Sequence, residues 1–195
     1  GRDLLKASGA EIRAVRGNQI SMIFQDPMSS LNPVVRVGEQ IAEVIRVHEK
    51  CTKKEAEEKA MEMLETVGIP AERAGDFPHQ FSGGMKQRVG IARAYAADPK
   101  LLIMDEPFGQ LDAQTRYQMQ EEILRIWEKE KRTVIFVTNN IEEACYLGDR
   151  IILLSDCPAT VKEVYPISIP RPRDMVSGEF LKLRTVISDN TDLAI

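Results

Sequence analysis

The chain has 195 residues, of which 43% are hydrophobic, so it is long enough to bury one sizeable core and a small satellite subdomain. Its 26 basic and 30 acidic residues nearly balance to a net charge of -4, which excludes an electrostatic case for nucleic-acid binding. No apolar run approaches the roughly 20 residues that a membrane-spanning helix requires.

Short apolar runs rich in β-branched residues recur along the chain, separated by longer helical stretches. They cover 20–24 (ISMIF), 101–105 (LLIMD), 133–138 (TVIFVT) and 150–154 (RIILL). Such alternation is typical of buried parallel strands in an α/β sheet. The sequence therefore predicts an α/β fold in which all of these runs are parallel strands.

A long segment with helical periodicity, about 36–97, separates the first two runs. Thr52 and Glu55 form a capping box that starts its second helix, and Gly68 ends that helix. Ser82 is a good N-cap for a third helix. We therefore predict a helical subdomain inserted into the sheet.

The tail from Pro166 onward differs in composition from the rest of the chain. Three prolines fall within seven residues, at Pro166, Pro170 and Pro172, and they exclude a regular helix or central strand there. We predict the end of a strand, an extended arm and a short helix.

Two adjacent carboxylates, Asp105 and Glu106, follow the apolar run at 101–105. Ligands of open α/β sheets bind at the carboxyl ends of the strands. An aspartate there can hold Mg²⁺, and a neighbouring carboxylate can orient or polarise the attacking water in phosphoryl transfer. Taken alone, such a pair is more often the solvated start of a loop.

The segment FSGGMKQR at 81–88 places two glycines directly after the N-cap serine of a helix. Bare backbone N–H groups at the positive end of a helix can bind an anion. The alternative is a glycine turn that only leads into the helix.

Together these motifs resemble those of the ATPase subunits of ABC transporters. FSGGMKQRVGIARA resembles the signature motif of that family, and LLIMDEPFGQLD resembles its Walker B strand and D-loop. ISMIFQDPMSSLNPVVRVGEQI, upstream, resembles the Q-loop segment. The resemblance implies a P-loop NTPase-like (RecA-like) parallel sheet, truncated at its N-terminus, with an inserted helical subdomain.

The resemblance also divides the chain into four segments. Residues 1–35 would be a partial nucleotide-binding core with the Q-loop, and residues 36–97 a helical subdomain ending in the signature helix. Residues 98–165 would be the nucleotide-binding core with Walker B, D-loop and switch strand, and residues 166–195 a C-terminal extension.

Roles for individual residues follow from the same resemblance. Asp105 would hold Mg²⁺ through water, and Glu106 would be the catalytic base. Gln25 would sense Mg²⁺ and the transferable phosphate, and would link the nucleotide site to the membrane partner.

The glycine loop implies a second ATPase subunit. By resemblance, Ser82, Gly83 and Gly84 would contact the γ-phosphate bound by the opposite subunit, and Asp112 would lie at the dimer seam. Whether that subunit is a second copy or a different chain stays open.

The implied function is that of an ATP-binding and ATP-hydrolysing subunit of an ABC-type importer, with ATP and Mg²⁺ as cofactors. Its partners would be transmembrane permease subunits and the second ATPase subunit, without nucleic acid. We expect a protein of cytosolic type, bound peripherally at the cytoplasmic face of the cell membrane. An ABC ATPase of DNA repair or translation is disfavoured by the balanced charge.

One family motif does not occur in these residues, the phosphate-binding loop G-x-x-x-x-G-K-[ST], or Walker A. In the family it lies upstream of the segment that begins here at Gly1, which is not a methionine, so we expect a fragment. The missing strand would lie between the runs at 133–138 and 150–154 and leave their inner edges unpaired. We expect weak or no ATP binding by these residues alone and only marginal folding.

A second departure is Asn139, which occupies the position of the family's switch histidine. Asparagine can donate a hydrogen bond to a γ-phosphate oxygen, but it cannot carry a proton or charge at neutral pH. We therefore count Asn139 with Glu106 and Gln25 as a catalytic position and expect slowed hydrolysis.

The sequence leaves open which solute is transported and whether the subunit is catalytically active. The first half resembles dipeptide and oligopeptide importers, whereas the second half, with its IPRPRD tail, resembles nitrate, sulfonate and taurine importers. The alternatives to an active subunit are a non-catalytic ABC half that supplies only its signature motif and a truncated fragment without independent function.

Overall fold

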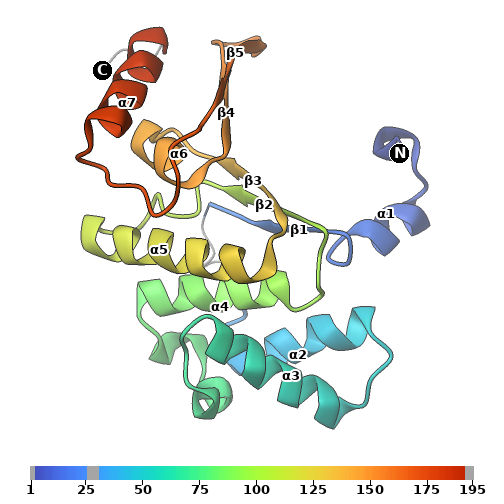
Figure 1. The fold of residues 1–195 in the computed structure, drawn as a ribbon. Helices are drawn as coiled ribbons and strands as arrows, with labels where there is room; N and C mark the ends of the chain where they lie inside the picture. The colour runs from blue at the N-terminus through green and yellow to red at the C-terminus, as the bar shows by residue number, and fades with distance from the viewer. Residues whose placement is uncertain (1–2, 26–30, 192–195) are drawn as a thin grey trace. The chain divides into compact units, whose positions relative to one another are not determined.

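The computed structural model describes residues 3–25 and 31–191 (Figure 1). The chain forms two compact units, residues 1–137 and residues 138–195, and each is described by itself. The four-segment division of the chain stays a prediction.

The first unit contains a parallel sheet of three strands. Its order is β1 (Ile20–Ile23), β2 (Leu101–Asp105) and β3 (Thr133–Val137), with Ile20 beside Leu101 and Leu101 beside Thr133. Leu102 and Met104 of β2 are fully buried. Three of the predicted parallel strands are thus confirmed.

The prediction that the fourth run pairs as a parallel strand is wrong. β4 (Arg150–Leu154) lies in the second unit and pairs antiparallel with β5 (Val161–Pro166). A tight turn between Ser155 and Thr160 reverses the chain, with Ser155 N–H donating to Thr160 O at 2.9 Å. The next segment is therefore the nearest pairing partner for β4.

The predicted burial of the last two apolar runs is also wrong. In β3, Ile135 is 49% exposed, and in β4, Leu154 is 56% exposed. Within the described residues, each of these strands pairs with a single neighbour, and successive side chains point to opposite faces. Each strand therefore has an unpaired edge among the described residues, and the alternation of exposed and half-buried side chains shows that one of its faces is solvated.

Helices of the predicted subdomain pack beside the sheet. α2 (Val37–His48) and α3 (Lys53–Thr66) contact one another, and α4 (Gly83–Tyr95) lies between this pair and β1 (Figure 1). The capping box is confirmed, with Thr52 N–H donating to Glu55 Oε2 at 2.7 Å. Fully buried Ile41, Ala56 and Leu64 form the apolar interior of the helix pair.

The remaining helices of the first unit are short, except α5. They are η1 (Leu4–Lys6), α1 (Gly9–Val15), η2 (Ala71–Gly75), η3 (Pro78–Gln80) and α5 (Ala113–Glu130). Met119, Ile123 and Ile126 of α5 are buried. Trp127 packs at the end of that helix and donates from Nε1 to Arg132 O at 2.8 Å.

The second unit continues with α6 (Ile141–Leu147), the β4–β5 hairpin and α7 (Gly178–Asn190). The segment between Pro166 and Gly178 contains no helix or strand. Strand end, extended arm and helix are therefore confirmed for the tail. Phe180 and Ile187 are the buried residues of α7.

Candidate functional site

The paired carboxylates lie at the carboxyl end of β2. Asp105 is its last residue, and Glu106 follows with a φ of +41°, which is rare for a residue with a side chain. Glu106 N–H donates to Val137 O at 2.8 Å, and Gly109 N–H donates to Glu106 O at 3.1 Å. These bonds fix the backbone of Glu106 in a strained conformation of the kind that gathers at functional sites.

Gln25 reaches Glu106 from the neighbouring strand. It follows β1, and its Nε2 donates to Glu106 Oε2 at 3.2 Å, although the two residues are 81 positions apart in the sequence. Because β1 and β2 are parallel, their carboxyl ends lie at one edge of the sheet. The predicted juxtaposition of the Q-loop and Walker B residues is present in the first unit.

The glycine loop begins α4 as predicted. Ser82 is the N-cap, and its Oγ accepts from Met85 N–H at 3.4 Å, while Gly83 and Gly84 are the first helical residues. A Cβ atom on Gly84 would lie 2.9 Å from Cγ2 of Thr115. The loop therefore packs directly against the first turn of α5.

Asp112 lies at the same place because it caps α5. Its Oδ1 accepts from Thr115 N–H at 3.0 Å. Hydrogen bonds from Thr115 lower the pKa of the Asp112 carboxyl, so the side chain is ionised at neutral pH. Thr115 thus joins the Ser82–Gly84 loop to Asp112, and the structure brings these four predicted residues together.

Gln87 makes a contact that the sequence motifs did not predict. It is 2% exposed, and its Nε2 donates to Pro107 O at 2.6 Å. This bond ties the helix that follows the glycine loop to the segment that follows Glu106. The available signal was a polar residue one helical turn before buried Ile91, on the face that packs inward.

Asn139 belongs to the second unit, where its neighbours hold the loop before α6. Asn140 caps that helix, its Oδ1 accepting from Glu142 N–H at 2.9 Å and from Glu143 N–H at 3.2 Å. Thr138 Oγ1 donates to Glu143 Oε2 at 2.8 Å and accepts from Asn140 N–H at 3.0 Å. The exposed side chain of Asn139 lies between these two anchored residues.

The oxygen donors at the sheet edge fit Mg²⁺ bound with a nucleotide. Within the described residues, no three His, Cys, Asp or Glu side chains are grouped as a metal site. Mg²⁺ needs only one or two carboxylates when phosphates and waters complete its octahedral shell. Asp105, the carboxylate that ends β2 next to Glu106, suits that mode of binding.

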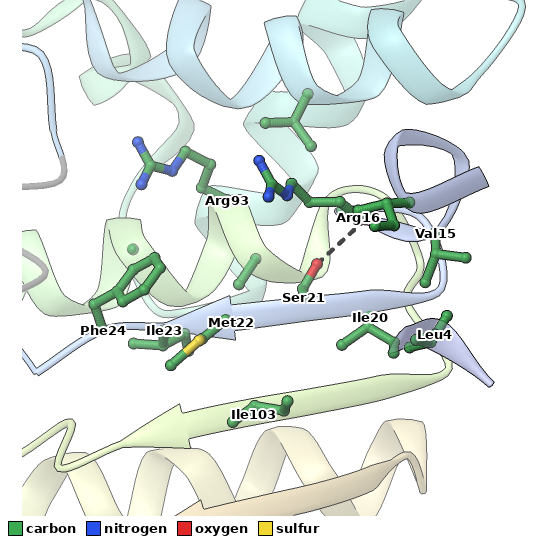
Figure 2. Close-up of a pocket in the computed structure, with 15 residues that line it drawn as sticks. Leu4, Val15, Arg16, Ile20, Ser21, Met22, Ile23, Phe24, Arg93 and Ile103 are labelled. Carbon is green, nitrogen blue, oxygen red and sulfur yellow. Dashed lines mark hydrogen bonds between the residues drawn. The ribbon is translucent and has the colours of Figure 1, made fainter. Parts of the chain in front are cut away.

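A separate hollow lies along β1 in the first unit (Figure 2). Its volume is about 820 Å³, and Ile20, Met22 and Phe24 line it with Arg16 and Arg93. Ser21 Oγ there donates to Gly17 O at 3.2 Å. The lining is mainly apolar and includes none of the predicted site residues.

Residues 1–109 match the family model described as "ABC transporter". The chain is 47% identical over 156 residues to the oligopeptide transport ATP-binding protein OppD of Bacillus subtilis, covering 79% of the chain and 44% of that relative. It is 43% identical over 155 residues to the dipeptide transport ATP-binding protein DppD of the same organism, covering 78% and 46%. The chain therefore spans about half the length of the curated relatives it matches.

Solved structures agree with the family match. The dimeric structure of MJ0796, a bacterial ABC transporter cassette, is 28% identical, with a TM-score of 0.70 over 84% of this chain and 69% of that one. A post-hydrolysis dimer of MJ0796 bound to ADP and Pi has a TM-score of 0.69 at 28% identity, over 83% and 68%. The predicted α/β fold of the P-loop NTPase type is confirmed.

Proposed function

Because the chain belongs to the ABC transporter family, we propose that it acts as an ATP-binding and ATP-hydrolysing subunit of an importer of the peptide type. One observation carries the proposal: Gln25 Nε2 contacts Glu106 Oε2 at 3.2 Å, at the strand edge where Asp105 ends β2. This contact supports roles for Glu106 as base, Asp105 as metal-binding carboxylate and Gln25 as sensing amide at one strand edge.

Glu106 is the general base in this proposal. Its carboxylate accepts the proton of the water that attacks the γ-phosphoryl group, a contribution of roughly 10²–10⁴ in rate. The N–H of Glu106 bound to Val137 O, at 2.8 Å, keeps the carboxylate at the end of the strand. Asp105 would hold the metal of MgATP and Gln25 would sense it, and the metal would supply the positive charge that neutralises the phosphate oxygens.

Gln25 has a second role in the proposal. It lies between β1 and the helical subdomain, so a displacement of that subdomain by a permease moves Gln25 relative to Glu106. Loss of the 3.2 Å contact between Gln25 and Glu106 would then couple the conformation of the permease to the catalytic base.

Ser82, Gly83 and Gly84 face a second ATPase subunit in this account. Their N–H groups begin a 13-residue helix and form an anion site suited to the γ-phosphate of a nucleotide bound by that subunit. The dimeric state of the MJ0796 cassette supports this arrangement. Asp112, joined to the loop through Thr115, would lie at the seam.

The solute class and the place of action rest on the relatives. OppD and DppD are named for oligopeptide and dipeptide transport, which supports peptides as the solute class. The likeness of the second half to nitrate, sulfonate and taurine importers stays a prediction. Within the described residues no helix has the length and apolarity to cross a bilayer, and peripheral attachment through the permease at the cytoplasmic face is part of the proposal.

Asn139 supports a second candidate function, a non-catalytic ABC half. An exposed asparagine at the switch position offers a neutral amide where the family has a titratable ring. Such a half would contribute the Ser82–Gly84 loop to its partner's nucleotide and perform no hydrolysis with Glu106.

ATP turnover in a mixture separates the two candidates. The chain would be joined to an upstream segment that carries the G-x-x-x-x-G-K-[ST] loop and mixed with an ABC ATPase subunit that cannot hydrolyse ATP, and Glu106→Gln would be compared with Glu121→Gln on the exposed face of α5. An active subunit predicts that Glu106→Gln lowers the chain-dependent turnover by about 100-fold while Glu121→Gln leaves it unchanged. Absence of turnover, or turnover that is indifferent to Glu106→Gln, would favour the non-catalytic half.

A further inference from the structure

The carboxyl end of α6 lacks the usual partners for its last carbonyl groups. α6 has only seven residues, and no basic residue lies in its last turn. The final carbonyls of any helix have no partner within that helix and need donors from elsewhere. In α6 these carbonyls belong to residues 145–148.

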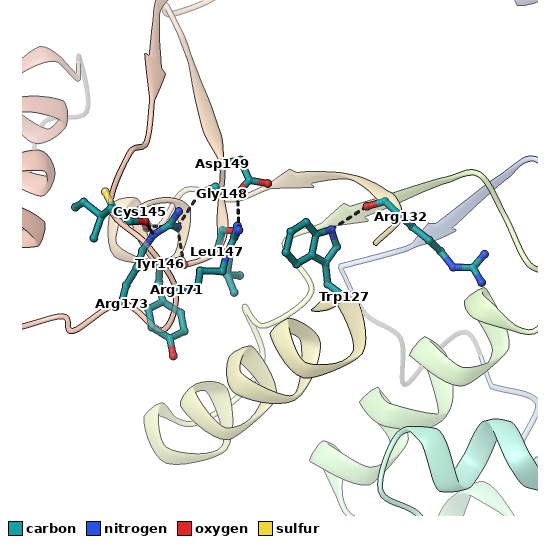
Figure 3. Close-up of polar contacts among 10 residues, drawn as sticks. Trp127, Arg132, Cys145, Tyr146, Leu147, Gly148, Asp149, Arg171 and Arg173 are labelled. Carbon is teal, nitrogen blue, oxygen red and sulfur yellow. Dashed lines mark hydrogen bonds and ion pairs between the residues drawn. The ribbon is translucent and has the colours of Figure 1, made fainter. Parts of the chain in front are cut away.

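Arg173, from the proline-rich arm, provides most of the donors. It is 5% exposed, and its Nη1 lies 2.9 Å from Cys145 O, 2.8 Å from Tyr146 O and 2.7 Å from Gly148 O (Figure 3). Its Nε donates to Ile169 O at 3.0 Å, within the arm itself. One guanidinium therefore joins the arm to the end of the helix.

Arg171 supplies the remaining contact. Its Nη2 donates to Leu147 O, and its Nη1 pairs with the carboxylate of Asp149 (Figure 3). We call Arg171 and Arg173 the guanidinium clasp. Each of the last four carbonyls, from Cys145 to Gly148, accepts from the clasp, and the positive charges lie at the negative end of the helix dipole.

At its amino end, α6 follows the loop Thr138–Asn140, which we call the switch loop. Asn140 caps the helix, and Glu143 accepts from Thr138 at 2.8 Å, so anchored residues stand on both sides of Asn139. A helix of this length is marginal by itself, because few hydrogen bonds repay the ordering of its backbone. Order at the capped end therefore depends on whether the last turn stays formed.

We propose that Arg173 is a positioning residue that holds Asn139 in place through α6. The proposal rests on the proposed function, in which Asn139 is a catalytic position. Without the clasp, the last carbonyls lose their donors, the helix frays, and Glu143 no longer fixes Thr138 beside Asn139. A lysine cannot replace Arg173 fully, because a single ammonium group lacks the planar fork of donors.

Hydrogen exchange of the 195-residue chain tests the structural half without nucleotide. In Arg173→Lys and Arg173→Gln, we expect the amides of Glu142–Ala144 to exchange about tenfold faster, while the β4–β5 hairpin keeps its protection. The control is Arg184→Gln, which removes an exposed ion pair of 3.1 Å to Glu142 and should change neither region. If Arg173→Gln unfolds the whole second unit, the amide exchange rates of Arg173→Lys test the proposal instead. Equal exchange in wild type and Arg173→Lys, or faster exchange throughout the unit, would overturn the proposal.

Turnover in the mixed assembly tests the functional half. We expect Arg173→Lys to lower kcat about tenfold with the KM for ATP unchanged, and to have no further effect in an Asn139→Ala background. Additive losses would show that Arg173 does not act through Asn139. Absence of chain-dependent turnover in wild type would refute the proposed function, and the exchange result would still decide the clasp.

Discussion

Gln87 donates from its buried side-chain amide to Pro107 O at 2.6 Å, so the helix after the glycine loop and the segment after Glu106 share one hydrogen bond. Replacing Gln87 by Leu fills a similar volume but leaves the Pro107 carbonyl without that donor. We expect the free energy of unfolding of the chain to fall by about 1–3 kcal/mol, measured by urea denaturation. Gln114→Leu, on the exposed start of α5, is the control, and an equal loss there would contradict the explanation.

Gly84 is favoured by packing, independently of the anion binding proposed for its loop. Its missing Cβ atom would approach Cγ2 of Thr115 to 2.9 Å, so Gly84→Ala should destabilise the chain by about 1 kcal/mol. Thr115→Ser removes that methyl group and keeps a hydroxyl on the same backbone. The double variant should therefore recover the lost stability in thermal melts. A double variant no more stable than Gly84→Ala would show that the contact is not the cause.

Asn139→His should accelerate hydrolysis in the mixed assembly. An imidazole can take up a proton and donate a charge-assisted hydrogen bond to a phosphate oxygen, so we expect about tenfold higher kcat. Asn139→Gln keeps the neutral amide and is the matched control, for which no gain is expected. If kcat of Asn139→His does not exceed that of wild type, the switch position does not limit turnover.

Cys145 should report whether the second unit is folded. Burial raises the pKa of its thiol from 9.0 to about 11, whereas Cys157 is exposed. At pH 8 an alkylating reagent should label Cys157 and spare Cys145 until denaturant is added, as read by mass spectrometry. Between pH 9 and 11 the unfolded chain ionises this thiol more readily than the folded one, so stability should fall over that window. Labelling of Cys145 at the rate of Cys157 would contradict its burial.

The sequence indicated those parts of the fold that leave a local pattern. Apolar runs predicted β1, β2 and β3, and the Thr52–Glu55 capping box and Ser82 predicted where α3 and α4 begin. β4 was misassigned because RIILL fits a buried parallel strand as well as an antiparallel hairpin with one open face. The turn from Ser155 to Thr160 decides between them, and it carries no strong turn motif.

Some residues of the candidate site could likewise be predicted from local sequence, whereas others could not. Asp105, Glu106 and the glycine loop could be predicted because their chemistry is written in adjacent residues. The bond from Gln87 to Pro107 joins residues 20 positions apart, and the contact of Arg173 with Cys145 joins residues 28 apart. The helical period can place Gln87 on an inward face, but nothing in the sequence says which distant carbonyl a donor reaches, so only the structure shows these bonds.

The proposed pairing of the Ser82–Gly84 loop with a nucleotide held by a second subunit is tested by a single charge at Ser82. Ser82→Asp keeps a good N-cap for α4 but places a negative charge against the γ-phosphate. Ser177→Asp makes the same change at the cap of α7 and is the control.

The measurement is sedimentation of the chain with an ABC ATPase subunit that carries the phosphate-binding loop and cannot hydrolyse ATP. We expect a complex that forms only with MgATP, is lost with Ser82→Asp and is kept with Ser177→Asp. No MgATP-dependent complex, or one that Ser82→Asp leaves intact, would contradict the assignment of the glycine loop and of the protein's function.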